Sequence, residues 1–246
     1  MQTIVKPWLV YLIAYVKSKK GVAFLASKFI IFSGIDGSGK STHARIFARK
    51  LKSNGMSVKY VYMRGLGRTF LSLPFLALCR LLKITKVHKL ESGIRVSEYP
   101  FYVYKPLRLL WPLIQLVDSM IYTLLLIRLP QHFYDVMILD RSPVDTLADI
   151  IADTRLSIGV GILQKLFLSL LPRNSIMIIL DVNEEIAFAR KKDILRKSYL
   201  SIRRRIYNKL AELYSWHVVS TNGSFETSTH SIESAILRVW DDAERT

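Results

Sequence analysis

Short apolar runs alternate with longer amphipathic segments along most of this chain. The runs have the length and composition of buried strands, and they cover residues 29–33, 58–63, 136–140, 176–181 and 217–220. In the intervening segments apolar residues recur every three or four positions, as in helices, over residues 41–53, 107–129, 145–153, 162–171, 184–214 and 231–242. Strands that alternate with helices predict a three-layer α/β fold, in which a five-stranded parallel sheet carries helices on both faces.

Two segments depart from this alternation. Residues 64–106 are the least regular, and we expect them to form an insert beside the substrate site of a single domain over 29–246. Residues 1–28 form an apolar and basic extension, whose apolar run at 8–16 would rise only about 14 Å as a helix. We expect this extension to pack on the insert; a helix on a membrane surface and a signal or anchor remain alternatives.

The net charge of the chain indicates which classes of partner it binds. Among 246 residues there are 36 Lys and Arg against 19 Asp and Glu, which gives a net charge of +17, yet half of the residues are hydrophobic. This combination favours a nucleotide or an anionic membrane surface as partner over a disordered chain. The apolar stretch 107–126 is interrupted by polar residues, so a spanning helix is not expected. We therefore expect a cytoplasmic protein, with the inner membrane surface as an alternative.

A glycine-rich loop joins the first predicted strand to the first predicted helix. Residues 34–41 fit the template G-x-x-x-x-G-K-S/T, whose backbone N–H groups surround a β-phosphate. Lys40 would reach the β- and γ-phosphates, and the Ser41 hydroxyl would hold Mg²⁺. The sequence therefore predicts that ATP and Mg²⁺ bind here. The loop residues expected to contact the nucleotide are Gly34, Ile35, Asp36, Gly37, Ser38, Gly39, Lys40, Ser41 and Thr42.

Three motifs together resemble the thymidylate kinase family. They are "GIDGSGKST" at 34–42, "MILDRSPVDTLAD" at 137–149, and "IILDVNEEIAFARKKDILRKS" at 178–198, which "RRRIYNKLAEL" follows. The likeness covers about residues 29–240. It implies a P-loop nucleoside monophosphate kinase that transfers the γ-phosphate of ATP, with dTMP to dTDP as the first candidate reaction. It also implies that Asp36 reaches the sugar of the acceptor nucleotide.

Acid and arginine side chains after the strands would complete the transfer chemistry. Asp140, at the end of a predicted strand, is placed to orient Mg²⁺, and Arg141 can fork onto an acceptor phosphate. Arg64 stands where the family has an arginine that touches the acceptor monophosphate, and Arg68 is a second candidate. A monophosphate is already anionic and needs arginines rather than a base. The alternatives are a structural Asp-Arg ion pair and solvated basic residues.

A basic cluster breaks the helical pattern near residues 190–198, where the resemblance implies a mobile lid. Gly37 leaves the P-loop without an arginine, and family members of this type supply one from the lid. Arg190 and Arg196 are therefore the candidates for stabilising transition-state charge. A solvated basic helix face is the alternative interpretation, and it is the stronger one for Arg203, Arg204 and Arg205.

The acceptor side departs from the family pattern. A gap-free count back from Asp140 places the thymine-binding arginine at Ser119 and the stacking phenylalanine at Gln115. With Asp118 they form one polar face of an apolar helix, which could line a different acceptor pocket or be an exposed stripe. Two further functions thus stay open: a kinase of a lipid-linked or sugar acceptor, and a membrane-associated ATP-binding protein without transfer activity. Specific nucleic-acid binding is not expected, and a homodimer remains open.

Overall fold

The structure is a computed structural model that describes residues 29–63, 70–90, 93–156, 161–191, 193–194 and 196–244, with side chains as far as Val239. The N-terminal extension lies outside the described residues. So do Arg64 and Arg68, the two arginines that the sequence assigns to the acceptor after the second strand.

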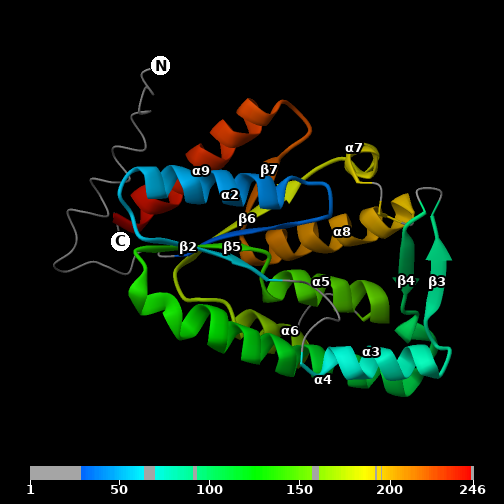
Figure 1. Cartoon of the computed structure of the whole chain (residues 1–246). Helices are drawn as coiled ribbons and strands as arrows, with labels where there is room; N and C mark the ends of the chain where they lie inside the picture. The colour runs from blue at the N-terminus through cyan, green and yellow to red at the C-terminus, as the bar shows by residue number, and fades with distance from the viewer. Residues whose placement is uncertain are drawn as a thin grey trace.

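A five-stranded parallel sheet forms the centre of the molecule, as the sequence predicts (Figure 1). Its strand order is β2-β5-β1-β6-β7, so the strand that precedes the glycine-rich loop is in the middle. β1 pairs in parallel with both β5 and β6, and it is buried along its whole length. The strands are β1 (Phe29–Gly34), β2 (Val58–Tyr62), β5 (Val136–Asp140), β6 (Ser175–Asp181) and β7 (His217–Ser220).

Helices cover both faces of this sheet (Figure 1). On one face, α2 (Lys40–Ser53) and α9 (Phe225–Glu244) pack through Phe47 and Ile232, among others. The other face is covered by the remaining large helices, which share a second core cluster with the odd-numbered side of β1. These are α4 (Lys105–Thr123), α5 (Pro143–Thr154), α6 (Ile162–Ser169) and α8 (Lys197–Tyr214). The three-layer α/β fold is thereby confirmed.

Three predicted helices have different limits in the structure. The segment 184–214 divides into α7 (Glu184–Arg190), whose N-terminus Asn183 caps, and α8, because the described residues Lys191, Asp193, Ile194 and Arg196 are not helical. The segment 107–129 is α-helical only as far as Thr123 and then forms a π-helical turn, η2 (Leu124–Arg128). The helix predicted over 231–242 is α9, which begins six residues earlier, at Phe225, and ends at Glu244.

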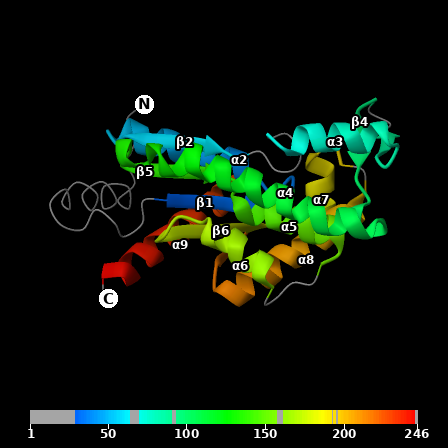
Figure 2. The same ribbon diagram turned by 90° about the horizontal axis from the view of Figure 1, so that it is seen from below.

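The described part of the insert contains regular structure of its own. α3 (Ser72–Leu81) is followed by an antiparallel hairpin of β3 (Lys86–Lys89) and β4 (Arg95–Glu98) and by a 3₁₀ turn, η1 (Phe101–Val103). A second 3₁₀ turn, η3 (Pro130–Phe133), follows η2 outside the insert. α3 lies beside α4, and the hairpin projects at one end of the molecule (Figures 1 and 2).

Candidate active site

The glycine-rich loop leaves β1 at the carboxyl edge of the sheet and opens directly into α2. Gly34 has φ +139°, and a Cβ there would stand 2.5 Å from the carbonyl oxygen of Leu180 on the neighbouring strand. Only glycine lets the chain turn this close to β6. The loop therefore wraps around the first turn of α2 with its backbone free to face a phosphate, as the sequence predicts for a P-loop.

The Lys40 side chain is buried inside the P-loop. Its Nζ donates hydrogen bonds to the carbonyl oxygens of Gly34, at 2.7 Å, and of Ile35, at 2.6 Å. Burial and the nearby Arg141 lower the pKa of Lys40 to about 8, although Asp36 acts in the opposite direction. At neutral pH the ammonium group is therefore charged, and it is positioned within the phosphate cradle.

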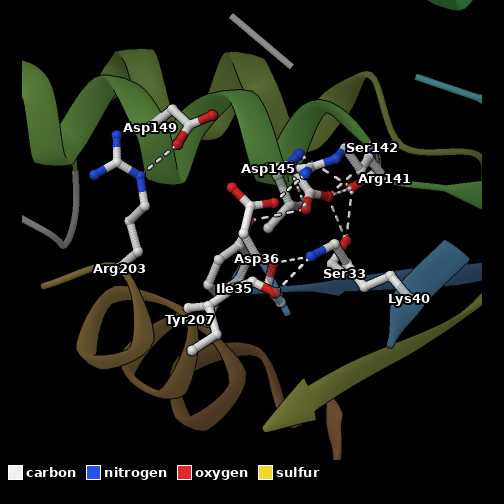
Figure 3. A network of polar contacts seen from close by, with 12 residues as sticks. Ser33, Ile35, Asp36, Lys40, Arg141, Ser142, Asp145, Asp149, Arg203 and Tyr207 are labelled. Atoms are coloured by element: carbon white, nitrogen blue, oxygen red, sulfur yellow. Dashed lines mark hydrogen bonds and ion pairs between the residues drawn. The ribbon is translucent and has the colours of Figure 1, made fainter. Parts of the chain in front are cut away.

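Arg141 is held in a conformation that few non-glycine residues adopt. Its φ is +74°, and its backbone N–H donates to Phe32 O at 2.9 Å. The guanidinium is thereby directed at the P-loop, where it hydrogen-bonds Asp36 (Figure 3). Burial would lower the pKa of Arg141, but Asp36 and Asp145 raise it well above its ordinary value. A left-handed backbone that the surroundings enforce is typical of a functional position.

The partner carboxylate, Asp36, is ionised by its surroundings. Burial would raise its pKa, but Arg141 and Lys40, together with Lys191, lower the pKa to about 2. Asp36 and Arg141 thus form a charged pair at the mouth of the P-loop. An incoming anion would compete with Asp36 for the guanidinium.

A fully buried carboxylate, Asp145, stands behind this pair and ties three elements together (Figure 3). It accepts hydrogen bonds from Ser33 Oγ at 2.6 Å, from the Ser142 backbone N–H at 2.9 Å and from the Tyr207 hydroxyl at 2.8 Å. Burial raises the pKa of Asp145 in spite of the nearby cations. Our sequence reasoning missed Asp145 as a site residue. The capping-box spacing of Ser142 and Asp145 at the start of α5 is the signal that could have found it.

Mg²⁺ is implied by the P-loop, and two oxygen-bearing side chains are suited to it. Asp140 Oδ1 is buried and has no hydrogen-bond partner among the described residues, whereas Oδ2 accepts from the Tyr60 hydroxyl at 2.6 Å. Ser41 lines the P-loop cavity in the first turn of α2. Among the described residues no group of three or more His, Cys, Asp or Glu could hold a metal by itself. An Mg²⁺ ion here would be bound largely through phosphates and water, and Ser41 and Asp140 are the side chains that could hold it.

The first lid arginine contacts the P-loop directly. Arg190, at the end of α7, donates to Gly37 O at 3.2 Å and to Thr221 O at 3.1 Å. The second candidate, Arg196, instead pairs with Glu98 of the insert hairpin at 3.2 Å. The structure therefore brings Arg190, but not Arg196, to the P-loop cavity.

The close approach of α7 to the loop gives a testable consequence. Gly37 has φ +84°, and a Cβ there would lie 2.6 Å from the carbonyl oxygen of Ala187. We expect Gly37→Ala to destabilise the fold by about 2–4 kcal/mol, from a left-handed non-glycine residue and an overpacked contact together. It should also raise the KM for ATP, because α7 and Arg190 must move. Thermal unfolding and initial rates measure the two effects.

Gly55→Ala is the matched control for that substitution. Gly55 has φ +82°, but no atom lies within 4 Å of the Cβ that alanine would add. We expect it to cost about 1–2 kcal/mol from backbone strain alone and to leave the KM for ATP unchanged. Equal effects of the two substitutions would show that the contact between Gly37 and Ala187 has no importance.

Two cavities meet at Asp36. The first, of about 500 Å³, is lined by residues Asp36 to His43 together with Arg141, Arg190 and Lys191, among others. The second, of about 480 Å³, extends from Asp36 between α5, α8 and the insert hairpin. Its other lining residues include Glu98, Tyr99, Tyr102, Asp153, Arg155, Arg196, Tyr199 and Arg203.

The P-loop cavity also contains an aromatic surface that sequence reasoning did not identify. The rings of His43 and Phe225 stack at 4.8 Å with an angle of 8° between their planes, and both line the cavity. Burial, with Arg190 and Lys50, lowers the pKa of His43 to about 4, so its ring is neutral at pH 7. A neutral aromatic surface is suited to a nucleobase.

A buried ion-pair cluster forms one wall of the second cavity. Arg203 of α8 donates to Asp149 at 2.6 Å (Figure 3). It also donates to Asp153 at 2.9 Å, and its guanidinium lies 3.6 Å from the centre of the Tyr199 ring. Burial raises the pKa of Asp153 to about 6, although Arg203 acts against it. The sequence pattern suggested only that Arg203 belongs to a solvated helix face. The structure instead buries it, because α5 and α8 pack together.

The polar face of α4 is also buried and has partners. Asp118 accepts hydrogen bonds from the backbone N–H groups of Leu71, at 3.0 Å, and Ser72, at 2.9 Å. The Gln115 side chain donates to Ser72 Oγ, and Ser119 is buried beside them. These contacts hold the N-terminus of α3 on α4, and neither Gln115 nor Ser119 belongs to the lining of the two cavities that meet at Asp36. The alternative of an exposed stripe is therefore wrong, and an acceptor role for Gln115 and Ser119 stays a prediction.

Comparisons with known proteins support the same fold. No family model matches the chain, and no curated protein matches it in sequence. Solved structures do match, 157 chains in all. One of them, a thymidylate kinase from Ehrlichia chaffeensis, superimposes with a TM-score of 0.53 and 19% sequence identity; the match covers 88% of this chain and 99% of that one. At this identity the likeness establishes an α/β P-loop kinase fold.

Proposed function

We propose that this protein transfers the γ-phosphate of ATP to a nucleoside monophosphate, with dTMP as the first candidate acceptor. The observation that supports it is the meeting of two cavities at Asp36, one built on the P-loop and one beside it. Phosphoryl transfer requires a donor and an acceptor to approach in line from two sides of one point. ATP would occupy the P-loop cavity and the acceptor the second one, in the cytoplasm where both are present.

The charges at the junction are those that the transfer needs. Lys40, Arg141 and Arg190 line the P-loop cavity, and these three cations would stabilise the negative charge of the migrating group. Mg²⁺, held by Ser41 and Asp140, would neutralise part of the phosphate charge. Arg141 is the one cation that also contacts Asp36, so it is the natural ligand for the acceptor phosphate.

The acidity of Asp36 supports an acceptor that is already anionic. A carboxylate with a pKa of about 2 is a poor general base for a hydroxyl group. The oxygen of a monophosphate is ionised at neutral pH and needs no base, only cations to hold it. The junction therefore favours a phosphate over a hydroxyl acceptor.

A second candidate is a larger phosphorylated or hydroxyl acceptor with an apolar or sugar portion. A further cavity, of about 710 Å³, lies between α3 and β4 and shares Tyr99 and Asp193 with the acceptor cavity. Its walls include Leu73, Leu76, Ile94 and Val96. The combined space is larger than a nucleotide requires. Asp153, with its raised pKa, would be the base candidate if the acceptor is a hydroxyl.

Turnover of labelled ATP with a panel of acceptors tests these candidates. The panel is dTMP, dUMP, dCMP, dGMP, a polyprenyl monophosphate and a free sugar, each with and without Mg²⁺. We expect a nucleoside monophosphate to be used. We also expect only a small preference for dTMP over dUMP, because Gln115 and Ser119 replace the stacking ring and the arginine with which the thymidylate kinase family binds thymine. Losing those two contacts costs about 2–4 kcal/mol, or roughly 30- to 1000-fold in selectivity.

Each result of the panel separates the alternatives. Preference for the polyprenyl phosphate or the sugar would assign the second candidate. ATP binding without transfer to any acceptor would leave a nucleotide-binding protein without kinase activity. A preference for dTMP of a thousandfold or more would mean that residues other than Gln115 and Ser119 recognise the base.

A further inference from the structure

The solvent-exposed side of helix α4 is apolar, as is much of its buried side. Its inner face packs into the core through Trp111 and Leu116. On the outer face, leucine, valine and methionine recur at helical spacing and are exposed to solvent: Leu109 by 68%, Leu113 by 56%, Val117 by 41%, Met120 by 50% and Leu124 by 52%. The outer face of a surface helix is ordinarily polar.

The apolar face continues beyond α4 itself. From Leu109 to Leu129 every exposed residue is Leu, Val or Met. Within the continuous helical stretch Lys105–Phe133, an 18-residue window has a mean hydropathy of 1.7, which is apolar enough to cross a membrane. α3, which Asp118 and Gln115 hold beside α4, adds the exposed side chains of Leu78, Leu81 and Leu82. Figure 2 looks onto this side of the molecule, with α4 across the front and α3 beside it. We call this surface the α3–α4 face.

Most charged residues of the segment that carries the α3–α4 face are basic. The described residues between 70 and 133 contain two acids, and both are engaged: Asp118 with the start of α3, and Glu98 with His88 and Arg196. The same segment contains eight lysines and arginines, namely Arg80, Lys83, Lys86, Lys89, Arg95, Lys105, Arg108 and Arg128. An apolar face with a basic border complements an anionic lipid surface.

We propose that the α3–α4 face docks on an anionic membrane surface, with α4 in the plane of the interface. α4 is about 28 Å long and would insert its outer leucines below the headgroups, while Lys105 at its start and Arg128 beyond its end contact lipid phosphates. A second copy of this chain fits less well. A two-fold axis across α4 would bring Lys105 and Arg128 of the two copies together, without an acid on this face to separate them.

Vesicle flotation of the full chain tests the proposal. The probes are vesicles of phosphatidylcholine alone and of phosphatidylcholine with phosphatidylglycerol. We expect binding to the anionic vesicles, and we expect the triple substitution Leu113→Gln, Val117→Gln and Leu124→Gln to weaken it roughly 30-fold. Replacing Lys83, Lys86 and Lys105 by glutamine should weaken binding roughly fivefold per cation, on anionic vesicles only.

Matched controls identify what covers the face. Leu213→Gln with Val218→Gln removes equally exposed apolar residues elsewhere and should not change binding. ATP turnover in solution, and therefore the proposed function, should be the same in the wild type and in the triple variant.

Three results would overturn the proposal. They are the absence of binding to anionic vesicles, unchanged binding of the triple variant, and a wild-type dimer in sedimentation velocity that the triple substitution splits. Loss of binding on Leu9→Gln with Leu12→Gln, while the triple variant still binds, would assign the contact to the N-terminal extension instead.

Discussion

Replacement of Lys40 by alanine should lower the turnover of phosphoryl transfer roughly 1000-fold. The ammonium group is fixed by two carbonyl oxygens of its own loop, so it needs no reorganisation when charge develops on the migrating phosphate. A preorganised charge of this kind contributes most in a water-excluded site. The measurement is the initial rate with labelled ATP at saturating acceptor.

Two companion variants separate chemistry from folding. Lys52→Ala removes an exposed lysine from the same helix and should leave the rate unchanged. Lys40→Arg keeps a positive charge in the loop and should retain more activity than Lys40→Ala. Since Lys40 also ties the loop, circular dichroism and thermal unfolding should accompany the rates. Full turnover in a folded Lys40→Ala variant would exclude the P-loop from the chemistry.

Replacement of Arg141 by alanine should lower kcat/KM for the acceptor about 100- to 1000-fold. The guanidinium lines the P-loop cavity and hydrogen-bonds Asp36, which also lines the second cavity, so it is the cation that we expect an acceptor phosphate to meet first. Its loss should also raise the pKa of Asp36 from about 2, because burial would then be opposed only by Lys40 and Lys191. Acceptor KM and kcat, measured across pH, report both effects.

ATP binding distinguishes an acceptor role from a donor role for this arginine. We expect the Kd for ATP to change little in Arg141→Ala, and Arg49→Ala, at an exposed position of α2, should leave all constants as they are. Weakened ATP binding with an unchanged acceptor KM would place Arg141 on the donor side and would contradict its proposed role.

Much of the fold and the donor half of the site could be predicted from local patterns. Each central strand is a short run of apolar residues, and each covering helix shows its own period, so neighbouring residues are sufficient to identify them. The P-loop is equally local: its glycines, Lys40 and Ser41 lie within eight residues, and the turn from strand to helix brings them together without any distant contact. Asp140 and Arg141 follow a strand end, which places them at the same edge of the sheet.

The acceptor half was decided by the tertiary structure. Arg203 appeared to belong to a solvated basic face, but it pairs with Asp149, 54 residues away, because α5 and α8 pack together. Arg196 was grouped with Arg190 by proximity in sequence, yet the chain between them leaves the helix and turns Arg196 toward Glu98, 98 residues away. Gln115 and Asp118 bind the start of α3, more than 40 residues earlier. Helical period shows which residues share a face, but only the packing of distant segments determines what that face contacts.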